Sequence, residues 1–298
     1  AGNRVESCEV FDTGGGAVAF GPFGRVGRQA APSSDCAMVD CAVHNFGAVY
    51  ADTVGVWAAE APRLHIEHNH ISQGGYSGIS AGWIWGHEYT APPGECPQYH
   101  VPRIMESTVI SGNDVSRVMR ELTDGGGIYV LGSQGGPTGP ARMESNWVHD
   151  IVRNPVWTSG ACNGLYFDQG SDGWLVAGNL IERTTRLIHF NCFGKDGRTP
   201  DPCSGCNQPC RGEPYGHAAW HSPFRSDNGH LWPGQEWDLD RPNYFDRDPT
   251  VVPNNGWGTA GLPAFMIIKG HLRTGDAIRQ EAGPRTNWVF ERDPVVHP

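Results

Sequence analysis

The sequence predicts an all-β fold, a right-handed parallel β-helix (solenoid) with about six or more coils and long loop insertions. Three observations predict it. Six segments share one apolar alternating pattern, and most are followed by a second short strand that begins near glycine. A small or amide residue recurs at one offset within these segments. The chain is also rich in turn residues, with 41 Gly and 23 Pro among 298 residues and only 18% charged residues.

Each repeat is expected to contribute two strands. The first strands fall in residues 4–12, 38–46, 64–72, 104–112, 142–150 and 174–182. The second strands fall in residues 16–21, 54–60, 77–83, 126–132, 163–170 and 186–192. Because a solenoid stacks equivalent positions of successive coils, this alignment places residues side by side that are far apart in the sequence.

A polar ladder is expected inside one turn of the solenoid. The repeats align on the last core residue of each first strand, namely Val10, Val43, Ile71, Ile110, Val148 and Ile181. Two positions earlier stand Cys8, Cys41, Asn69, Thr108, Asn146 and Asn179. Stacked amides hydrogen-bond to one another along the stacking axis, so we expect the three Asn side chains to point into one turn. The alternative is that Asn only marks turns.

The repeats favour a single domain over residues 1–298, with coils over 4–192 and a C-terminal segment, 235–298, that the sequence assigns poorly. The two insertions are 83–102 and 194–234. No apolar run reaches the roughly 18 residues of a membrane helix. Ala1 falls almost directly before the first strand, so we expect an upstream segment, a partner chain or a loop to cover the N-terminal edge of the solenoid.

Charge and cysteine content limit the class of partner. The net charge is −10 and the chain holds no basic run, which argues against nucleic acid. Nine Cys favour an oxidising, extracellular compartment. Cys8 and Cys41 are adjacent ladder positions that form either a disulfide or two buried thiols. Cys203, Cys206 and Cys210 favour disulfides over zinc or Ca²⁺, and no cofactor is expected.

Alternation in the second strands separates two faces. The inward face holds Ile79, Ile128, Val130, Leu165, Phe167, Ile188 and Phe190. The outward face carries one stripe of Trp57, Ser80, Tyr129, Tyr166 and His189, and beside it a second stripe of Ala59, Gly82, Leu131, Asp168 and Asn191. Aromatic rings, carboxylates and amides suit sugars, and the alternative is an ordinary solvated strand face. The two insertions, the first beginning at Trp83, are expected to wall this surface into a cleft.

Three strings carry a resemblance to a known group. YSGISAGWIWG (76–86), TDGGGIYVLG (123–132) and NGLYFDQGSDG (163–173) resemble the central motifs of right-handed parallel β-helix glycoside hydrolases, nearest to glycoside hydrolase family 141 and more distantly family 120. The resemblance spans roughly residues 4–197 in matching order. It implies a secreted enzyme that hydrolyses plant or algal glycans, with Asp124 and Asp168 as the catalytic pair. The chain departs from the pattern at Gln169, where Glu is common.

Asp124 and Asp168 can lie close together only if the chain bends. A straight strand would separate Asp124 from the neighbour of Asp168 by roughly 20 Å, so the glycine turn at 125–127 must fold Asp124 back over the stripe. The alternative is that Asp124 caps a turn. Three function classes therefore stand: a glycoside hydrolase; a non-catalytic structural or carbohydrate-binding module of an extracellular assembly; and a polysaccharide lyase, which is disfavoured because the stripe lacks Lys and Arg.

Overall fold

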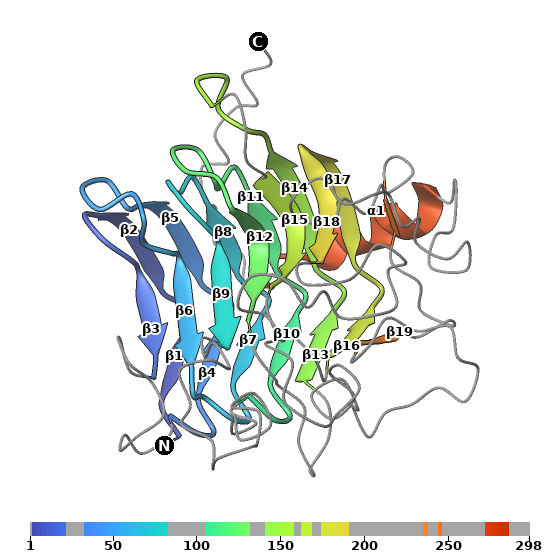
Figure 1. Ribbon diagram of the computed structural model, residues 1–298. Helices are drawn as coiled ribbons and strands as arrows, with labels where there is room; N and C mark the ends of the chain where they lie inside the picture. The colour runs from blue at the N-terminus through green and yellow to red at the C-terminus, as the bar shows by residue number, and fades with distance from the viewer. Residues whose placement is uncertain are drawn as a thin grey trace, which may run out of the picture.

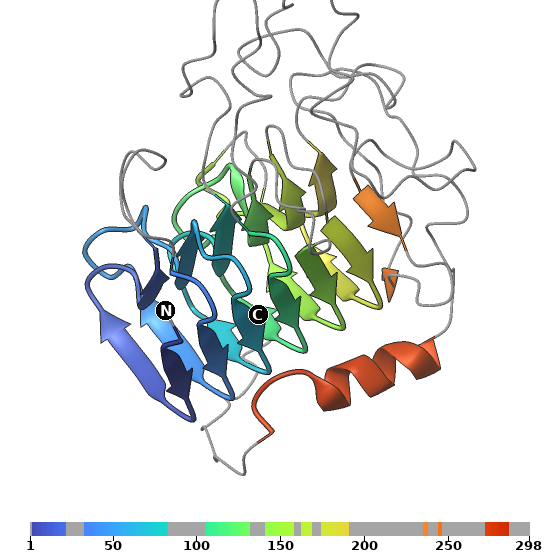
Figure 2. The same ribbon diagram turned by 90° about the horizontal axis from the view of Figure 1, so that it is seen from below.

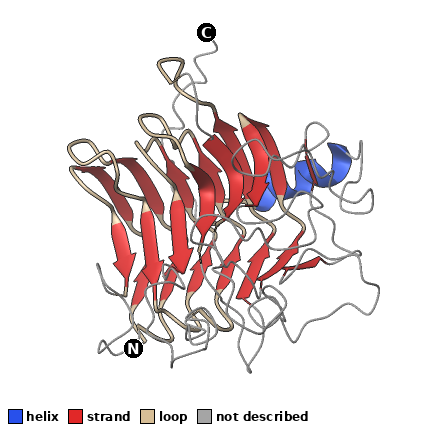
Figure 3. Cartoon of the chain, in the orientation of Figure 1, coloured by secondary structure: helices blue, strands red, loops and turns tan. Residues whose placement is uncertain are grey.

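The chain winds into a right-handed parallel β-helix, seen in a computed structural model that describes residues 2–21, 33–82, 105–131, 141–157, 162–168, 174–190, 235–237, 244–245 and 272–285. Figures 1 and 3 show short strands stacked coil upon coil, with the chain advancing steadily from the N-terminal strands. Every pairing between neighbouring strands of the described residues is parallel. The predicted fold class is confirmed.

Three sheets form the faces of the solenoid. Sheet A contains β1 (Arg4–Glu6), β4 (Ala37–Val39), β7 (His65–Glu67), β10 (Val109–Ser111), β13 (Ala141–Glu144), β16 (Trp174–Ala177) and β19 (Gln235–Trp237). Sheet B contains β2 (Glu9–Thr13), β5 (Ala42–Phe46), β8 (His70–Ser72), β11 (Asp114–Ser116), β14 (Trp147–Ile151), β17 (Leu180–Thr184) and β20 (Tyr244–Phe245). Sheet C contains β3 (Val18–Phe20), β6 (Val56–Ala59), β9 (Ile79–Gly82), β12 (Gly125–Val130), β15 (Cys162–Phe167) and β18 (Arg186–Phe190).

The prediction of two strands per repeat is wrong, because each predicted first strand is two strands joined by a sharp turn. In the first coil, β1 ends at Glu6 and β2 begins at Glu9. The residue before the ladder position has a left-handed backbone in each of the first six coils, at Ser7, Asp40, His68, Gly112, Ser145 and Gly178. A left-handed residue bends the chain sharply within one or two positions, so sheets A and B meet at this turn.

The alignment of the fourth repeat is also wrong. Ile110 pairs with Ile66 in sheet A, and it is Val115 that pairs with Ile71 in sheet B. The ladder residue of this coil is therefore Asn113 and not Thr108. Thr108 lies before β10, where its hydroxyl donates to the Ala61 carbonyl. A shift of five positions preserves an apolar residue at the aligned site, which is why the apolar pattern alone did not reveal it.

The amide ladder itself is confirmed. Asn69 Nδ2 donates to Asn113 Oδ1 at 2.9 Å, Asn113 Nδ2 to Asn146 Oδ1 at 2.9 Å, and Asn146 Nδ2 to Asn179 Oδ1 at 2.8 Å. The same amides also donate to backbone carbonyls of the preceding coils. All four side chains are fully buried, so the ladder satisfies the polar groups of a turn that has no access to water.

Aliphatic columns fill the interior of the solenoid. Ile79, Ile128, Leu165 and Ile188 stack in register along sheet C and belong to the core, as predicted for the inward face. The four cysteines that the structure describes, Cys8, Cys36, Cys41 and Cys162, are free thiols. Cys8 and Cys41 are therefore both thiols, but the expectation that both are buried is wrong, because Cys8 is exposed. The buried Cys41 thiol, whose pKa burial raises, donates to the Val39 carbonyl.

A C-terminal helix lies across the turn between sheets A and B, a feature that the sequence did not predict. Helix α1 (Leu272–Glu281) runs alongside the strands in Figure 2. Arg279 binds Glu182 of β17 at 2.7 Å, and Gly283 N donates to the Gly112 carbonyl at 2.8 Å. Further on, Arg285 binds Asp40. The segment 272–285 thus straps the sixth coil back to the second.

We expect this strap to detach in acid. Burial raises the pKa of the Glu182 carboxyl, but hydrogen bonds from Arg279, Trp147 and Arg183 outweigh it and hold the pKa at about 2, below the ordinary 4.5. A depressed carboxyl pKa contributes stability above pH 4.5 that is lost as the pH falls toward 2. The protection factors of residues 278–285, which express hydrogen exchange corrected for the intrinsic effect of pH, should fall across this window.

Glu182→Gln should accelerate that exchange already at neutral pH, because the amide cannot replace the paired carboxylate. The control is Asp35→Asn. Asp35 also has a pKa lowered to about 2 by Arg63, but it is exposed on sheet A. Equal acceleration of exchange in the strap by both substitutions would contradict the claim that Glu182 holds it in place.

Candidate functional site

The outward stripe of sheet C forms in the predicted register. Trp57 pairs with Ser80, Ser80 with Tyr129, Tyr129 with Tyr166, and Tyr166 with His189. The rings of Tyr129 and Tyr166 meet edge to face with centroids 5.1 Å apart, and Tyr166 stacks on His189 at 4.3 Å. Five adjacent strands thus carry one continuous polar and aromatic column.

Less of the stripe is accessible than the outward position suggested. Tyr129, Tyr166 and His189 are 4%, 2% and 1% exposed. They do not belong to the interior core, because Tyr129, Leu131 and Tyr166 form a small separate cluster. Phe167, the next residue along β15, belongs to the interior, so the face assignment holds. Asp168 and Trp57 remain partly accessible.

Asp168 follows β15 and is held by the adjacent strand. Its backbone N–H donates to the Val130 carbonyl at 2.9 Å, which continues the sheet C register by one residue. Its side chain accepts a hydrogen bond from the Tyr129 hydroxyl. Burial and the negative charge of Asp168 raise the pKa of Tyr129 well above its usual value, so this phenol stays protonated and acts as the donor.

Asp124 does fold back over the stripe. Its carboxylate accepts a hydrogen bond from the Tyr166 hydroxyl at 3.1 Å, and its backbone carbonyl accepts one from Tyr76 at 2.7 Å. The expected glycine turn is different in detail. Gly125–Val130 is strand β12, and the bend lies at Asp124 itself, which has a left-handed backbone with φ of 64°.

The glycines of β12 act by allowing close approach. A Cβ at Gly126 would lie 3.3 Å from Tyr166 Cβ, and one at Gly125 would lie 2.7 Å from the Tyr76 ring. Contacts this short require neighbouring atoms to move. Small residues at these positions therefore let the tyrosine that holds Asp124 lie against the start of β12.

The two carboxylates act on the same phenols. Burial is the main cause that raises the pKa of Tyr166, and the negative charges of Asp168 and Asp124 add to it. Burial is again the main cause that raises the pKa of Tyr76, and the same two charges add to it. Asp124 and Asp168 therefore both lie beside one group of tyrosines, namely Tyr76, Tyr129 and Tyr166. Tyr76 was missed as a site residue, although it begins one of the strings that carry the family resemblance.

His189 is neutral and has unused hydrogen-bonding capacity. Burial, with a contribution from the positive charge of Arg186, lowers its pKa to about 3. Neither ring nitrogen has a hydrogen-bond partner among the residues that the structure describes. A buried imidazole with both nitrogens unpaired carries a desolvation cost, which a ligand hydroxyl could offset.

The pKa of His189 predicts acid sensitivity. Its folded-state pKa of about 3 lies below the ordinary 6.5, so the unfolded chain binds more protons between these values. The free energy of unfolding should therefore fall as the pH drops from 6.5 toward 3. His189→Phe keeps a ring against Tyr166 without a titrating group, so urea unfolding at several pH values should show a shallower decline.

The matched control is His44→Phe on sheet B, where the histidine stacks on Phe11 and binds Glu9. This variant should keep the pH dependence of the wild type. An unchanged slope in His189→Phe would contradict the assignment of the acid sensitivity to His189.

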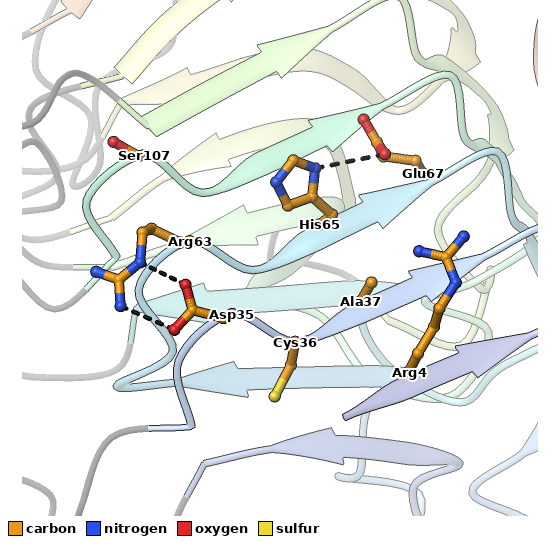
Figure 4. Close-up of a pocket in the computed structure, with 8 residues that line it drawn as sticks. All are labelled: Arg4, Asp35, Cys36, Ala37, Arg63, His65, Glu67 and Ser107. Carbon is orange, nitrogen blue, oxygen red and sulfur yellow. Dashed lines mark hydrogen bonds and ion pairs between the residues drawn. The ribbon is translucent and has the colours of Figure 1, made fainter. Parts of the chain in front are cut away.

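A concave region lies on sheet A, away from the stripe. This groove of about 530 Å³ is lined by Arg4, Asp35, Cys36, Ala37, Arg63, His65, Glu67 and Ser107. Figure 4 shows that its charged groups already pair with each other, Arg63 with Asp35 and His65 with Glu67. It offers mainly satisfied polar groups, in contrast to the unpaired atoms on sheet C.

Several predicted features lie outside the described residues. These are the site residues Trp83 and Asn191, the insertion 83–102 and the insertion 194–234 with Cys203, Cys206 and Cys210. Within the described part of the chain, no three His, Cys, Asp or Glu side chains gather in a way that could hold a metal ion. In the same part, no helix has the length and apolar character to cross a bilayer.

Comparisons with known proteins support the architecture. No protein-family model and no curated protein matches this chain. A solved structure described as a glycoside hydrolase is similar, with a TM-score of 0.51 and 21% sequence identity. The match covers 63% of this chain and 30% of the other, so this chain corresponds to less than a third of that protein. At this identity the likeness shows a shared β-helix fold of the kind found in a glycoside hydrolase.

Proposed function

We propose that the chain is a secreted glycoside hydrolase that cleaves a plant or algal glycan on the outer face of sheet C, with Asp124 and Asp168 as the catalytic carboxylates. The observation that carries this proposal is that both carboxylates are hydrogen-bonded to adjacent tyrosines of one stripe, Asp124 to Tyr166 and Asp168 to Tyr129. Glycoside hydrolysis commonly uses two carboxyl groups that flank the scissile bond.

The surroundings of the two groups suggest different roles. Asp168 is partly buried and accepts the Tyr129 hydrogen bond, which suits an ionised base or nucleophile. Asp124 is exposed at the start of β12, where it can regain a proton from solvent after each turnover. In this scheme Asp124 protonates the leaving oxygen, while Asp168 activates water or attacks the anomeric carbon.

The rest of the stripe would bind the sugar. Trp57 offers a partly accessible ring for stacking on sugar C–H groups. The neutral His189 offers one ring nitrogen as donor and one as acceptor for hydroxyls. Tyr129 and Tyr166 orient the carboxylates, and Trp83 and Asn191 complete the proposed set of substrate-binding residues. The resemblance to glycoside hydrolase family 141, and more distantly family 120, together with the similar solved structure, favours this class.

A non-catalytic carbohydrate-binding or structural module of an extracellular assembly is the second candidate. The burial of Tyr129, Tyr166 and His189 favours it, because only a small part of the stripe is open to a polymer. In that case Asp124 and Asp168 would bind hydroxyls without transferring protons.

The test is a panel of aryl glycosides and plant and algal oligosaccharides, assayed for new reducing ends. The wild type should release them from at least one substrate, and the double variant Asp124→Asn/Asp168→Asn should not. Binding without release by either protein would favour the module. Equal release by both would show that the activity comes from other residues.

A further inference from the structure

Arg186 is an arginine whose side chain has no partner in the described part of the chain. It is the first residue of β18 and is partly buried. No ion pair or hydrogen bond joins its guanidinium to any described residue, whereas Arg63, Arg183 and Arg279 each bind a carboxylate at 2.7 Å or less. A partly buried guanidinium without an acceptor loses hydration and gains nothing in return.

Its position is beside Asp124, one member of the proposed catalytic pair. Arg186 pairs in register with Asn163 of β15, and Asn163 pairs with Gly126, two residues after Asp124. Burial lowers the pKa of Arg186, while Tyr166 and Asp124 act to raise it. The guanidinium is therefore within electrostatic range of the carboxylate and the phenol that form one end of the site.

Unpaired polar atoms gather on the same two strands. Asn163 is fully buried and its Nδ2 donates to the Gly125 carbonyl, but its Oδ1 has no partner among the described residues. Both ring nitrogens of His189, on β18, also have no hydrogen-bond partner among the described residues. A buried amide oxygen accepts a ligand hydroxyl, and a guanidinium donates to an oxyanion. Together they match a sugar that carries both groups.

We propose that Arg186 binds an anionic group of the substrate, so that the glycan recognised on sheet C carries uronate carboxylates or sulfate esters. This inference names the substrate class of the proposed function. It rests on the proposed function only for the claim that the anionic glycan is cleaved. Arginine suits both anions, because its planar donors form paired hydrogen bonds with two oxygens of either. The outward stripe itself contains no Lys or Arg, as the sequence shows. Arg186 lies in the row of residues beside it and supplies the positive charge.

The experiment compares matched polymers that differ only in charge. One pair is polygalacturonate and its fully methyl-esterified form, and the other is a sulfated galactan and its desulfated form. Binding is measured by affinity electrophoresis and hydrolysis by new reducing ends. The proteins are the wild type, Arg186→Gln, Arg186→Lys and the control Arg4→Gln, which removes an exposed arginine from the sheet A groove.

The wild type should bind one charged polymer about 10-fold or more tightly than its neutral partner, and the polymer pair that shows the difference identifies the anion. Arg186→Gln should abolish the difference, Arg186→Lys should keep part of it, and Arg4→Gln should leave it intact. Circular dichroism confirms that each variant is folded, and the Lys variant provides the test if the Gln variant is not.

Equal binding of charged and neutral polymers by the wild type would overturn the inference, as would an undiminished preference in both Arg186 variants. A preference lost in Arg4→Gln alone would place the anion in the groove on sheet A and would also overturn it. Arg186-dependent binding without cleavage would uphold the inference and contradict the hydrolase. Cleavage of a neutral glycan that is unaffected by Arg186→Gln would uphold the hydrolase and contradict the inference.

Discussion

Replacing Asp168 by Asn is expected to reduce glycan hydrolysis by on the order of 10²–10⁴-fold, the usual effect of losing a positioned acid–base group. Asn keeps the shape of the side chain but cannot accept a proton or attack carbon. The contact with Tyr129 remains sterically feasible, so the free energy of unfolding should change little. Steady-state rates and urea unfolding, measured on the same preparations, separate lost chemistry from lost folding.

Asp124→Asn should have an effect of the same order if Asp124 supplies the proton. An aryl glycoside with a good leaving group distinguishes the roles, because it needs little protonation. Asp124→Asn should keep much of its activity on that substrate, whereas Asp168→Asn should not. The control is Asp35→Asn, a carboxylate of the sheet A groove. Undiminished hydrolysis in both site variants would contradict the catalytic assignment.

The largest effect on stability is expected from Asn113→Ala. Its amide donates to Ile66 O at 2.8 Å and to Asn146 Oδ1 at 2.9 Å, and its oxygen accepts from Asn69. The substitution removes these contacts and also takes away the acceptor of the buried Asn69 backbone N–H, which donates to Asn113 Oδ1 at 3.0 Å, at a cost of about 1–3 kcal/mol for each polar atom left without a partner where water cannot reach. We expect urea unfolding to show a loss of about 2–5 kcal/mol in the free energy of unfolding.

Thr108→Ala is the matched control for this prediction, because the apolar pattern alone places Thr108 in the ladder. Among the described residues, its hydroxyl hydrogen-bonds to Ala61 O and Leu64 N alone. The loss should therefore be smaller, about 1 kcal/mol. A larger loss for Thr108→Ala than for Asn113→Ala would contradict the register of the fourth coil.

Periodicity predicted the features that depend on alternation within a strand. The inward column of Ile128 and Leu165 and the outward column of Tyr129 and Tyr166 follow from a period of two, and neighbouring coils preserve it. The amide ladder was predicted from a recurring offset and is present for the same reason.

Features set by single backbone angles were not predicted. The third strand of each coil arises from left-handed residues such as Ser7 and Asp40, and the sequence pattern gives no direct signal of φ. The register of Asn113 depends on where one turn begins. The contact between Asp124 and Tyr166 depends on the bend at Asp124. Helix α1 packs on sheet B through Arg279 and Glu182, a pair 97 positions apart that no repeat relates.

The central claim is that this solenoid hydrolyses a glycosidic bond, and heavy-oxygen water tests it most directly. Mass spectrometry of the products formed in this solvent should show one heavy oxygen at each new reducing end, because hydrolysis adds one water molecule across the bond. The wild type should incorporate the label, whereas Asp168→Asn should incorporate far less of it in the same time. Unlabelled products with an unsaturated uronate at the new non-reducing end would show elimination by a lyase, and would contradict the claim.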